Sequence, residues 1–323
     1  MVCREDLSEL ICIAPFLAFV CMCRFVAYIG PQILADDLLY KPKFSLVTAQ
    51  SVNAGEMSVA VNGDGFGIGW YAPELDNEPC VFRSIKPSWS DQNLKNLARK
   101  IYSPCIFAHV RAASPGLTVE EVNSHPFACG QLMFMHNGVL GGYKTIRRRL
   151  LRTLNDTAYD AIQGSTDSEH LFGLFLNHIA DPFGTVTCEE MVHAMTKMFE
   201  DLNVLLLDAN VRQHSYLNLA VTNGTSLIVV RYTTNPNVQP ASLYYMYGKE
   251  YHCRADACTM EPSHGRPSTI VVASEPFTAR RSDWMKVERN GMMIIDETMR
   301  IRFQHVEMDI EHEDFETIAP EIG

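Results

Sequence analysis

The sequence predicts an α+β fold in which two β-sheets pack face to face and helices cover their outer faces, giving four layers in the order αββα. Two observations support this prediction. Up to about residue 203, apolar strand patterns alternate with helices of 3.6-residue periodicity. After residue 203 the pattern changes to short β-rich runs separated by turn residues. Because a sheet must bury one face, we expect the late runs to form a second sheet on the first.

The first part of the chain contains three early elements. A strand is predicted at MCRFVAYI (22–29), and the glycines of GFGIGWY (65–71) allow another segment to approach closely. A helix is predicted over residues 90–102, with Ser90 as its cap. Its apolar face is formed by Leu94, Leu97 and Ile101.

The middle of the chain contains two strands followed by helices. CIFAHVRA (105–112) and the run 131–136 are predicted strands. Three helices follow at about 143–155, 168–180 and 188–202. Thr187 and Glu190 have the spacing of a capping box for the last of them. Its inward stripe is an ordinary core pattern made of Met191, Met195, Met198 and Leu202.

The last third of the chain is rich in β-strand patterns. The runs expected in the second sheet are VLLLDA, LNLAVT, SLIVVRY, LYYMYG, TIVVAS and MMIID. Asn223-Gly224 and Asn290-Gly291 indicate turns between them. Residues 250–268 lack periodicity and are expected to form a loop. The acidic end of the chain is expected to be a solvated tail.

Composition indicates one large soluble domain. The chain has 323 residues, of which 47% are hydrophobic and 20% charged, so it can bury a sizeable core. Its net charge of −11 argues against a nucleic-acid surface, which would need a basic stripe. We therefore expect neither nucleic acid nor a membrane as a partner.

The ten cysteines show no repeated pair spacing, which is typical of reduced thiols in a cytoplasmic protein. Cys253 and Cys258 lie beside His252 and raise the question of a metal. Their spacing is wider than that of a zinc knuckle, and no second pair follows. We therefore expect a loop with reduced thiols and no metal site.

An ordered series of polar motifs lies between residues 106 and 167, namely FAHVRAAS, NSHPF, FMHNG and STDSE. Arg111 stands where a predicted strand opens into a loop. Asn137-Gly138 tolerates positive φ and presents a side-chain amide beside a backbone N–H. Two such donors that converge on one point form an oxyanion hole. With Met22-Cys23-Arg24 upstream, the series indicates a site that cleaves a glutamine amide.

Each motif also has a simpler structural interpretation. Arg111 alone is typical of a surface ion pair, Asn137-Gly138 of a hairpin turn, and Asp167 of a helix N-terminus. His125 before a proline is typical of a loop. The order and spacing of all four motifs favour the functional interpretation, because four unrelated coincidences would otherwise be needed.

Together these motifs resemble the glutaminase domain of the class II glutamine amidotransferases, which are N-terminal nucleophile hydrolases. The matching segments, from about Cys23 to about Asp296, are MCRFVAYIGP (22–31), LLYKPKFSL (38–46), NGDGFGIGWY (62–71), the polar series, and VVASEPF (271–277) followed by Trp284. The chain is most similar to the stand-alone branch, which includes the fungal subunit that degrades glutathione and the bacterial γ-glutamyl hydrolase of ergothioneine synthesis. The resemblance implies the αββα sandwich over residues 23–300, which leaves an N-terminal extension of residues 1–22 and an acidic C-terminal tail of residues 301–323 outside it.

The resemblance also implies the catalytic residues. Cys23 would attack the amide carbon with its thiol, while its own α-amine, with a pKa of about 7.7–8.0, would serve as general base. Asn137 and the Gly138 N–H would stabilise the oxyanion. The glycine-rich segment 65–71 would be a turn near the Cys23 amine. No cofactor is implied.

Three further residues would bind the substrate. The planar fork of Arg111 would hold the α-carboxylate of the glutamyl group. Asp167 would hold its α-ammonium, and His125 would line the glutamyl pocket.

The chief departure from the family pattern is that 22 residues precede Cys23. A peptide bond on the Cys23 nitrogen would remove the general base. Translation from Met22, removal of a propeptide, or a pseudoenzyme would each explain the extension, and we favour a start at Met22. The apolar stretch 10–23 is short for a membrane span and lacks a basic region before it, so secretion is disfavoured.

Three functions follow from these observations. The first is hydrolysis of a γ-glutamyl amide, either glutamine or a larger compound such as glutathione. The second is a glutaminase subunit that supplies ammonia to a separate synthetase. For these two functions, the partner we expect besides the γ-glutamyl substrate is a peptidase or synthetase subunit in a hetero-complex. The third is a noncatalytic γ-glutamyl-binding protein in which Cys23 stays blocked. The sequence leaves the leaving group undetermined.

Overall fold

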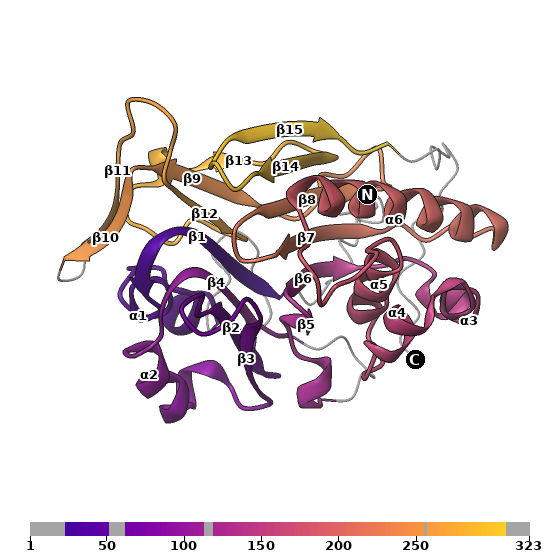
Figure 1. Cartoon of the computed structure of the whole chain (residues 1–323), viewed down its shortest axis with the longest axis horizontal. Helices are drawn as coiled ribbons and strands as arrows, with labels where there is room; N and C mark the ends of the chain where they lie inside the picture. The colour runs from indigo at the N-terminus through magenta and orange to yellow at the C-terminus, as the bar shows by residue number, and fades with distance from the viewer. Residues whose placement is uncertain (1–22, 52–61, 113–118, 255–256, 308–323) are drawn as a thin grey trace, which may run out of the picture.

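The computed structural model describes residues 23–51, 62–112, 119–254 and 257–307. Two antiparallel sheets dominate these residues (Figure 1). The predicted extension 1–22 and the last part of the predicted tail, residues 308–323, lie outside the described residues. Within the described part, no helix combines the length and the apolar character needed to cross a membrane.

The first sheet has seven strands in the order β13-β9-β12-β1-β4-β2-β3. They are β1 (Arg24–Leu34), β2 (Phe66–Tyr71), β3 (Pro79–Ser84), β4 (Tyr102–Val110), β9 (Tyr244–Gly248), β12 (Thr269–Ala273) and β13 (Met285–Lys286). Antiparallel pairing sets Arg24 opposite Val110. The start of β1 therefore lies beside the end of β4.

The second sheet has six strands in the order β15-β14-β8-β7-β6-β5. They are β5 (Phe127–Cys129), β6 (Leu132–Val139), β7 (Tyr216–Thr222), β8 (Leu227–Thr233), β14 (Gly291–Ile295) and β15 (Ile301–His305). The predicted turns at Asn223-Gly224 and Asn290-Gly291 are confirmed, since Gly224 and Asn290 both have positive φ between strands.

In the part of the chain that the structure describes, six α-helices flank the sheets. They are α1 (Asp36–Leu39), α2 (Gln92–Ala98), α3 (Tyr143–Thr153), α4 (Asp156–Asp160), α5 (Asp167–Leu176) and α6 (Cys188–Asp208). Helices α3 to α6 lie with β5 to β8, whereas α1 and α2 lie beside β1 to β4 (Figure 1). The capping box of Thr187 and Glu190 at the start of α6 is confirmed. The methionine stripe of that helix is fully buried, as predicted.

Alternation along the strands produces the layers. In β1, Phe25 and Ala27 point into a core between the two sheets, whereas Val26 and Tyr28 point into a core shared with α1 and α2. A third core joins the second sheet to α3–α6. The predicted order αββα is therefore confirmed.

Several local predictions are wrong. The segment VLLLDA continues α6, because Leu205 and Leu206 extend that helix's apolar face. The late strands do not form one sheet, since β9 and β12 join the first sheet beside β1.

Three smaller predictions also differ from the structure. Residues 66–71 form a strand rather than a turn. Helix α2 is capped by Asp91 rather than Ser90, because the Asp91 carboxylate accepts the Leu94 N–H. β15 lies inside the predicted tail.

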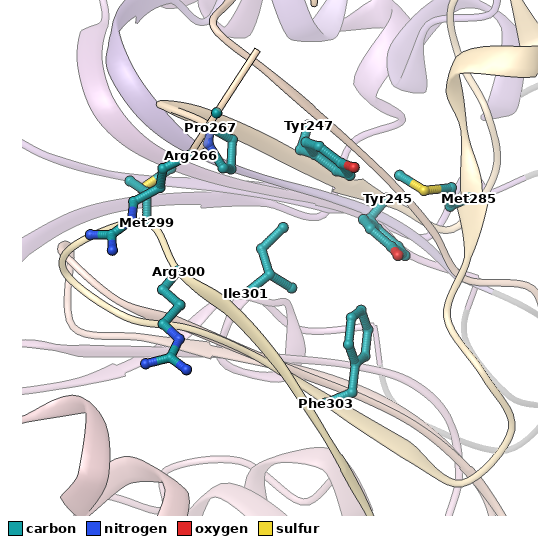
Figure 2. A pocket seen from close by; sticks show the side chains of 10 residues that line it. Tyr245, Tyr247, Arg266, Pro267, Met285, Met299, Arg300, Ile301 and Phe303 are labelled. Atoms are coloured by element: carbon teal, nitrogen blue, oxygen red, sulfur yellow. The ribbon is translucent and has the colours of Figure 1, made fainter. Parts of the chain in front are cut away.

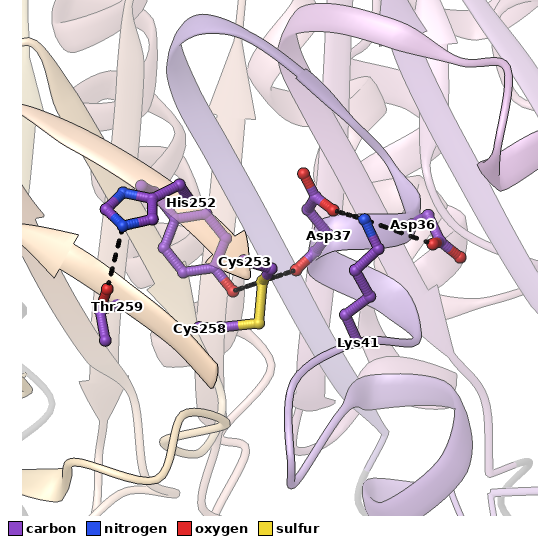
Figure 3. The surroundings of a disulfide bond; sticks show 8 residues. Asp36, Asp37, Lys41, His252, Cys253, Cys258 and Thr259 are labelled. Atoms are coloured by element: carbon purple, nitrogen blue, oxygen red, sulfur yellow. Dashed lines mark hydrogen bonds and ion pairs between the residues drawn. A yellow bond between two sulfur atoms is a disulfide. The ribbon is translucent and has the colours of Figure 1, made fainter. Parts of the chain in front are cut away.

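The segment 250–268 contains a hairpin rather than a loop. β10 (Glu250–Arg254) pairs with β11 (Ala257–Glu261), and Cys253 stands opposite Cys258. The two sulfurs form a disulfide across the hairpin, with the Cα atoms 4.0 Å apart (Figure 3). The expectation of reduced thiols at this pair is therefore wrong. The hairpin packs on α1, where the Tyr251 hydroxyl donates to the Asp37 carbonyl at 3.0 Å.

Candidate active site

Cys23 immediately precedes β1, a central strand of the first sheet, and so lies at one end of that strand. It is half-buried, and its Sγ lies 3.4 Å from the Ala112 nitrogen and 3.5 Å from the Ala112 oxygen. Ala112 follows the end of β4, and the antiparallel pairing of β1 with β4 makes this contact. The predicted nucleophile therefore lies where the start of β1 meets the end of β4, two central strands of the first sheet.

Arg111 lies one residue before Ala112 and is buried. Its backbone N–H donates to the Gly65 oxygen at 2.9 Å, and its own carbonyl accepts the Asp64 N–H at 3.1 Å. These bonds fix Arg111 against the segment that leads into β2. Burial lowers the pKa of the guanidinium, and the neighbouring Cys23 acts in the opposite direction. Because an arginine titrates so far above neutral pH, Arg111 keeps its charge and can bind an anion beside Cys23.

Asn137 and Gly138 come from the second sheet. They lie within β6 rather than in a hairpin turn, opposite Asn218 and Leu217 of β7. Asn137 is buried, and its Nδ2 donates to Ser274 Oγ over 3.4 Å. Ser274 follows β12 and also accepts the Phe25 N–H at 3.0 Å. One serine therefore connects the amide of Asn137 to the strand that begins after Cys23.

Gly138 occupies a backbone position that excludes a side chain. Its φ is +151°, and a Cβ there would lie 1.8 Å from the Tyr216 oxygen. The strand can hold Asn137 and the Gly138 amide in this geometry only with glycine at the second position.

Asp167 is the first residue of α5, and Thr166 caps that helix. Its Oδ2 accepts the Leu140 N–H at 2.8 Å, and its Oδ1 accepts the Ser168 N–H at 2.8 Å. Leu140 lies two residues beyond Gly138, so Asp167 is tied to the loop that leaves β6. Asp167 is half-buried, and its carboxylate lies near His136.

His125 is more deeply enclosed than a pocket-lining residue needs to be. Its ring lies against that of His109, tilted by 32° with 4.2 Å between ring centres, and contacts Phe127 at 4.6 Å between ring centres. Among the described residues, neither ring nitrogen of His125 has a hydrogen-bond partner. Burial lowers the pKa of His125 well below its ordinary value and that of His109 to about 3. Both rings are therefore neutral at pH 7 and do not compete with Arg111 for an anion.

The structure thus brings five of the six predicted residues into one connected region at the ends of β1, β4 and β6. These are Cys23, Arg111, Asn137, Gly138 and Asp167. His125 lies behind them in a buried aromatic cluster. In the described part of the chain, no three histidine, cysteine, aspartate or glutamate side chains are grouped as a metal site.

A separate groove of about 400 Å³ lies at the edges of the two sheets, among strands β9, β13 and β15. Figure 2 shows Tyr245, Tyr247 and Phe303 around Ile301 in this groove. None of the six predicted residues lines it. The predicted site residues therefore lie at the strand ends described above, apart from this groove.

Three residues of this region were not predicted as site residues. Ser274 contacts Asn137, and Glu275 forms an ion pair with Arg24 beside Cys23. The signal in the sequence is a polar pair directly after the apolar run TIVVA, together with one cation at the start of the apolar run RFVAYI. Both patterns place polar groups at strand ends, as Arg111 does.

Comparison with known proteins identifies the family to which this arrangement is similar. The family model described as glutamine amidotransferases class-II matches residues 37–314. The probable glutamine amidotransferase DUG3 of Saccharomyces cerevisiae is 37% identical over 298 residues, which are 85% of this chain and 82% of the yeast protein. The gamma-glutamyl-hercynylcysteine sulfoxide hydrolase of Mycolicibacterium smegmatis is 28% identical, over 79% of this chain and 88% of that protein.

Solved structures show the same fold. A glutamine aminotransferase class-II domain protein from Silicibacter pomeroyi superposes with a TM-score of 0.62 at 25% identity, covering 88% of this chain and 99% of its own. The glutamine phosphoribosylpyrophosphate amidotransferase of Bacillus subtilis superposes with a TM-score of 0.56 at 17% identity. That likeness covers 89% of this chain and half of the longer enzyme.

Proposed function

Because this chain belongs to the class II glutamine amidotransferases, we propose that it hydrolyses a γ-glutamyl amide bond through a glutamyl-thioester on Cys23. The observation that carries the proposal is the meeting of Cys23, Arg111 and Asn137 at the ends of three strands from two sheets. The substrate is glutamine or a larger γ-glutamyl compound such as glutathione. The similarity to a hydrolase named for a γ-glutamyl substrate favours the larger compounds.

The glutamyl group would be held at its α-carbon by two opposite charges. Arg111 offers a planar pair of N–H donors to the α-carboxylate, and the low dielectric of a buried site strengthens this bond. Asp167 offers a carboxylate to the α-ammonium near the loop that leaves β6. The γ-carbonyl carbon is then directed toward Cys23 Sγ.

The chemical step needs an α-amine on Cys23 that is not in a peptide bond. That amine takes the thiol proton as sulfur attacks the amide carbon, and the oxyanion that forms accepts from Asn137 Nδ2 and the Gly138 N–H. The ammonium then gives its proton to the departing nitrogen, and the C–N bond breaks to leave the thioester. A water molecule, deprotonated by the same amine, releases glutamate and restores the thiol.

The test compares two forms of the chain. One begins at Met1 and the other at Cys23, which retains every strand and helix described above. Glutamate release is measured with glutamine, glutathione and γ-glutamyl-p-nitroanilide. We expect turnover only for chains whose first residue is Cys23, and none for Cys23→Ala in the same form.

Rapid acid quenching followed by intact mass measurement tests the intermediate. The form beginning at Cys23 should gain one glutamyl group during turnover, and Cys23→Ala should not. Equal hydrolysis by Cys23→Ala, or no hydrolysis of any of the three amides by the chain that begins at Cys23, would overturn the proposal.

A further inference from the structure

Arg24 uses every nitrogen of its guanidinium in the described contacts around Cys23. Its Nε and Nη2 donate to the same carboxylate oxygen of Glu275, at 2.9 and 2.7 Å. Its Nη1 donates to the backbone oxygen of Cys23 at 3.1 Å. The Arg24 and Glu275 side chains are only 3% and 4% exposed. A buried ion pair therefore holds the carbonyl of the predicted nucleophile.

Glu275 is itself held firmly in place. The preceding residue, Ser274, donates its N–H to the Phe25 oxygen and accepts the Phe25 N–H on Oγ, each at 3.0 Å. Gln50 donates to the Glu275 backbone oxygen at 3.3 Å, and Asn62 donates to the Gln50 oxygen at 3.1 Å. The position of Glu275 is therefore fixed from two sides, by β1 through Ser274 and by Gln50.

Desolvation makes a buried ion pair an inefficient way to stabilise a fold. Well-packed apolar side chains commonly stabilise an interior position as well, so stability alone does not explain this pair. The contact that an apolar pair could not supply is the bond from Nη1 to the Cys23 carbonyl. That bond is directed at the one residue whose orientation decides the chemistry.

We propose that Arg24 and Glu275 are positioning residues that fix the backbone of Cys23, and with it the directions of the thiol and the α-amine. This inference rests on the proposed function. An N-terminal residue has no preceding peptide bond to hold it, so contacts to its carbonyl and its side chain contribute strongly to its orientation. Arg24 secures the carbonyl, and Ala112 contacts the sulfur.

The effect of losing this hold follows from geometry. A thiol misplaced by about 1 Å can lose on the order of 10²-fold in rate, because attack needs alignment with the carbonyl carbon. Binding of the substrate by Arg111 would be retained, since that side chain is held at the end of β4 and not by Arg24 or Glu275. The loss should therefore fall on kcat and leave KM nearly unchanged.

The charges supply a second readout. The charged side chains near Cys23 and its neighbour Arg111 come from several elements. They are Arg24 of β1, Asp64 before β2, Arg111 after β4, Glu120 before the 3-10 turn at Glu121–Asn123, and Glu275 after β12, and Asp64 and Glu120 act on Arg111. The opposite charges of Arg24 and Glu275 cancel in the parent chain. Glu275→Gln leaves a cation near the amine and lowers the amine's pKa, whereas Arg24→Gln leaves an anion and raises it.

The experiment uses the chain that begins at Cys23, alongside the full chain. Glu275→Gln, Arg24→Gln and Arg24→Lys are compared with Arg231→Gln. Arg231 of β8 is equally buried, and its guanidinium donates to the backbone oxygens of Pro240, Ala241 and Val287. This control removes a buried guanidinium without touching Cys23.

We expect Glu275→Gln and Arg24→Gln to lower kcat by about tenfold to a hundredfold with little change in KM. The acidic limb of the kcat/KM profile should move to lower pH in Glu275→Gln and to higher pH in Arg24→Gln. Arg24→Lys should recover part of the rate. Arg231→Gln should lower Tm without changing the profile.

Alkylation of Cys23 by iodoacetamide gives a readout that does not need turnover. Its pH dependence should shift in the two charge variants and not in Arg231→Gln. If kcat, the pH profile and alkylation in Glu275→Gln and Arg24→Gln all match the parent chain, the positioning role is wrong. If the parent hydrolyses no γ-glutamyl amide while the alkylation profiles still shift, the proposed function fails and the positioning role stands.

Discussion

Asn137 Nδ2 and Ser274 Oγ lie 3.4 Å apart, and this contact joins the two sheets beside Cys23. The bond is long for an N–H···O hydrogen bond, so it holds the amide weakly. Among the described residues, Asn137 Oδ1 has no partner. An oxyanion formed at Cys23 could therefore take the Nδ2 donor from Ser274 at little cost. In the proposed mechanism, the serine would orient this amide before the substrate arrives.

Asn137→Ala should lower kcat by about 10²- to 10³-fold, because it removes a donor to charge that exists only in the transition state. KM should change little. Steady-state kinetics with a γ-glutamyl amide measures both.

Asn218→Ala is the matched control for this variant. Asn218 stands opposite Asn137 on β7, is equally buried, and donates to the Ala241 and Ser242 oxygens. It should lose stability and keep its kcat. Similar kcat losses in both variants would mean that Asn137 acts through the fold alone.

Gly138→Ala should cost about 3 kcal/mol or more in the free energy of unfolding, because the new methyl group overpacks the strand. A Cβ at this position meets the backbone oxygen of Tyr216, which cannot rotate away. Activity should fall as well, since β6 must shift. Chemical unfolding and kinetics on the same samples measure these effects.

Gly265→Ala provides the comparison, because a Cβ at Gly265 meets nothing within 4 Å. It should leave stability and activity near those of the parent. If Gly138→Ala behaved in the same way, the close contact with Tyr216 would not exist.

Arg111→Ala should weaken recognition of the α-carboxylate, and a substrate comparison isolates this effect. The parent chain should prefer γ-glutamyl-p-nitroanilide to its 4-aminobutyryl analogue, which lacks the α-carboxylate, by roughly tenfold or more, the size of a charge-assisted hydrogen bond. Arg111→Ala should show little preference, because the partner of the carboxylate is gone.

The readout is the ratio of kcat/KM for the two amides in each chain. A ratio that is unchanged by Arg111→Ala would place the carboxylate elsewhere. Arg111→Lys, which keeps the charge and loses the planar fork, should give an intermediate ratio.

Stability should fall as the pH drops below about 6.5, the ordinary pKa of an unfolded histidine. Burial lowers the pKa of His109 to about 3. Between these values the folded chain binds fewer protons at His109 than the unfolded chain, so unfolding takes up protons and acid favours it. His109 should contribute a slope of ~1 kcal/mol per pH unit between about pH 5 and 6.

His109→Gln should reduce that slope in urea unfolding curves recorded across this range. The comparison variant is His305→Gln, because it removes a histidine that the fold leaves exposed. Equal slopes in all three chains would show that His109 binds protons equally in the folded and unfolded states over this range, which would contradict the lowered pKa.

The sequence predicts the layers of the fold, because these depend on local patterns, whereas the roles of the candidate site residues come from the family resemblance and stay predictions. Period-2 alternation in residues 24–29 sorts Phe25 and Val26 onto opposite faces, as observed. The polar residues at strand ends, such as Arg111, meet because β1 and β4 pair antiparallel.

What the sequence could not provide is the pairing of distant segments. Nothing local shows that β12 joins β1 rather than the late strands, so Ser274 and Glu275 could not be placed beside Cys23. The same limit applies to Cys253 and Cys258, whose disulfide depends on the register of a hairpin. VLLLDA shows the converse case, since a short apolar run fits a helix end as well as a strand.

The identity of the first residue in active protein from the native cells tests the nucleophile most directly. Intact mass and terminal peptide sequencing of the fraction that hydrolyses a γ-glutamyl amide should show a chain that begins at Cys23. Activity in a chain that retains residues 1–22 would contradict an α-amine base on Cys23, and with it the proposed mechanism.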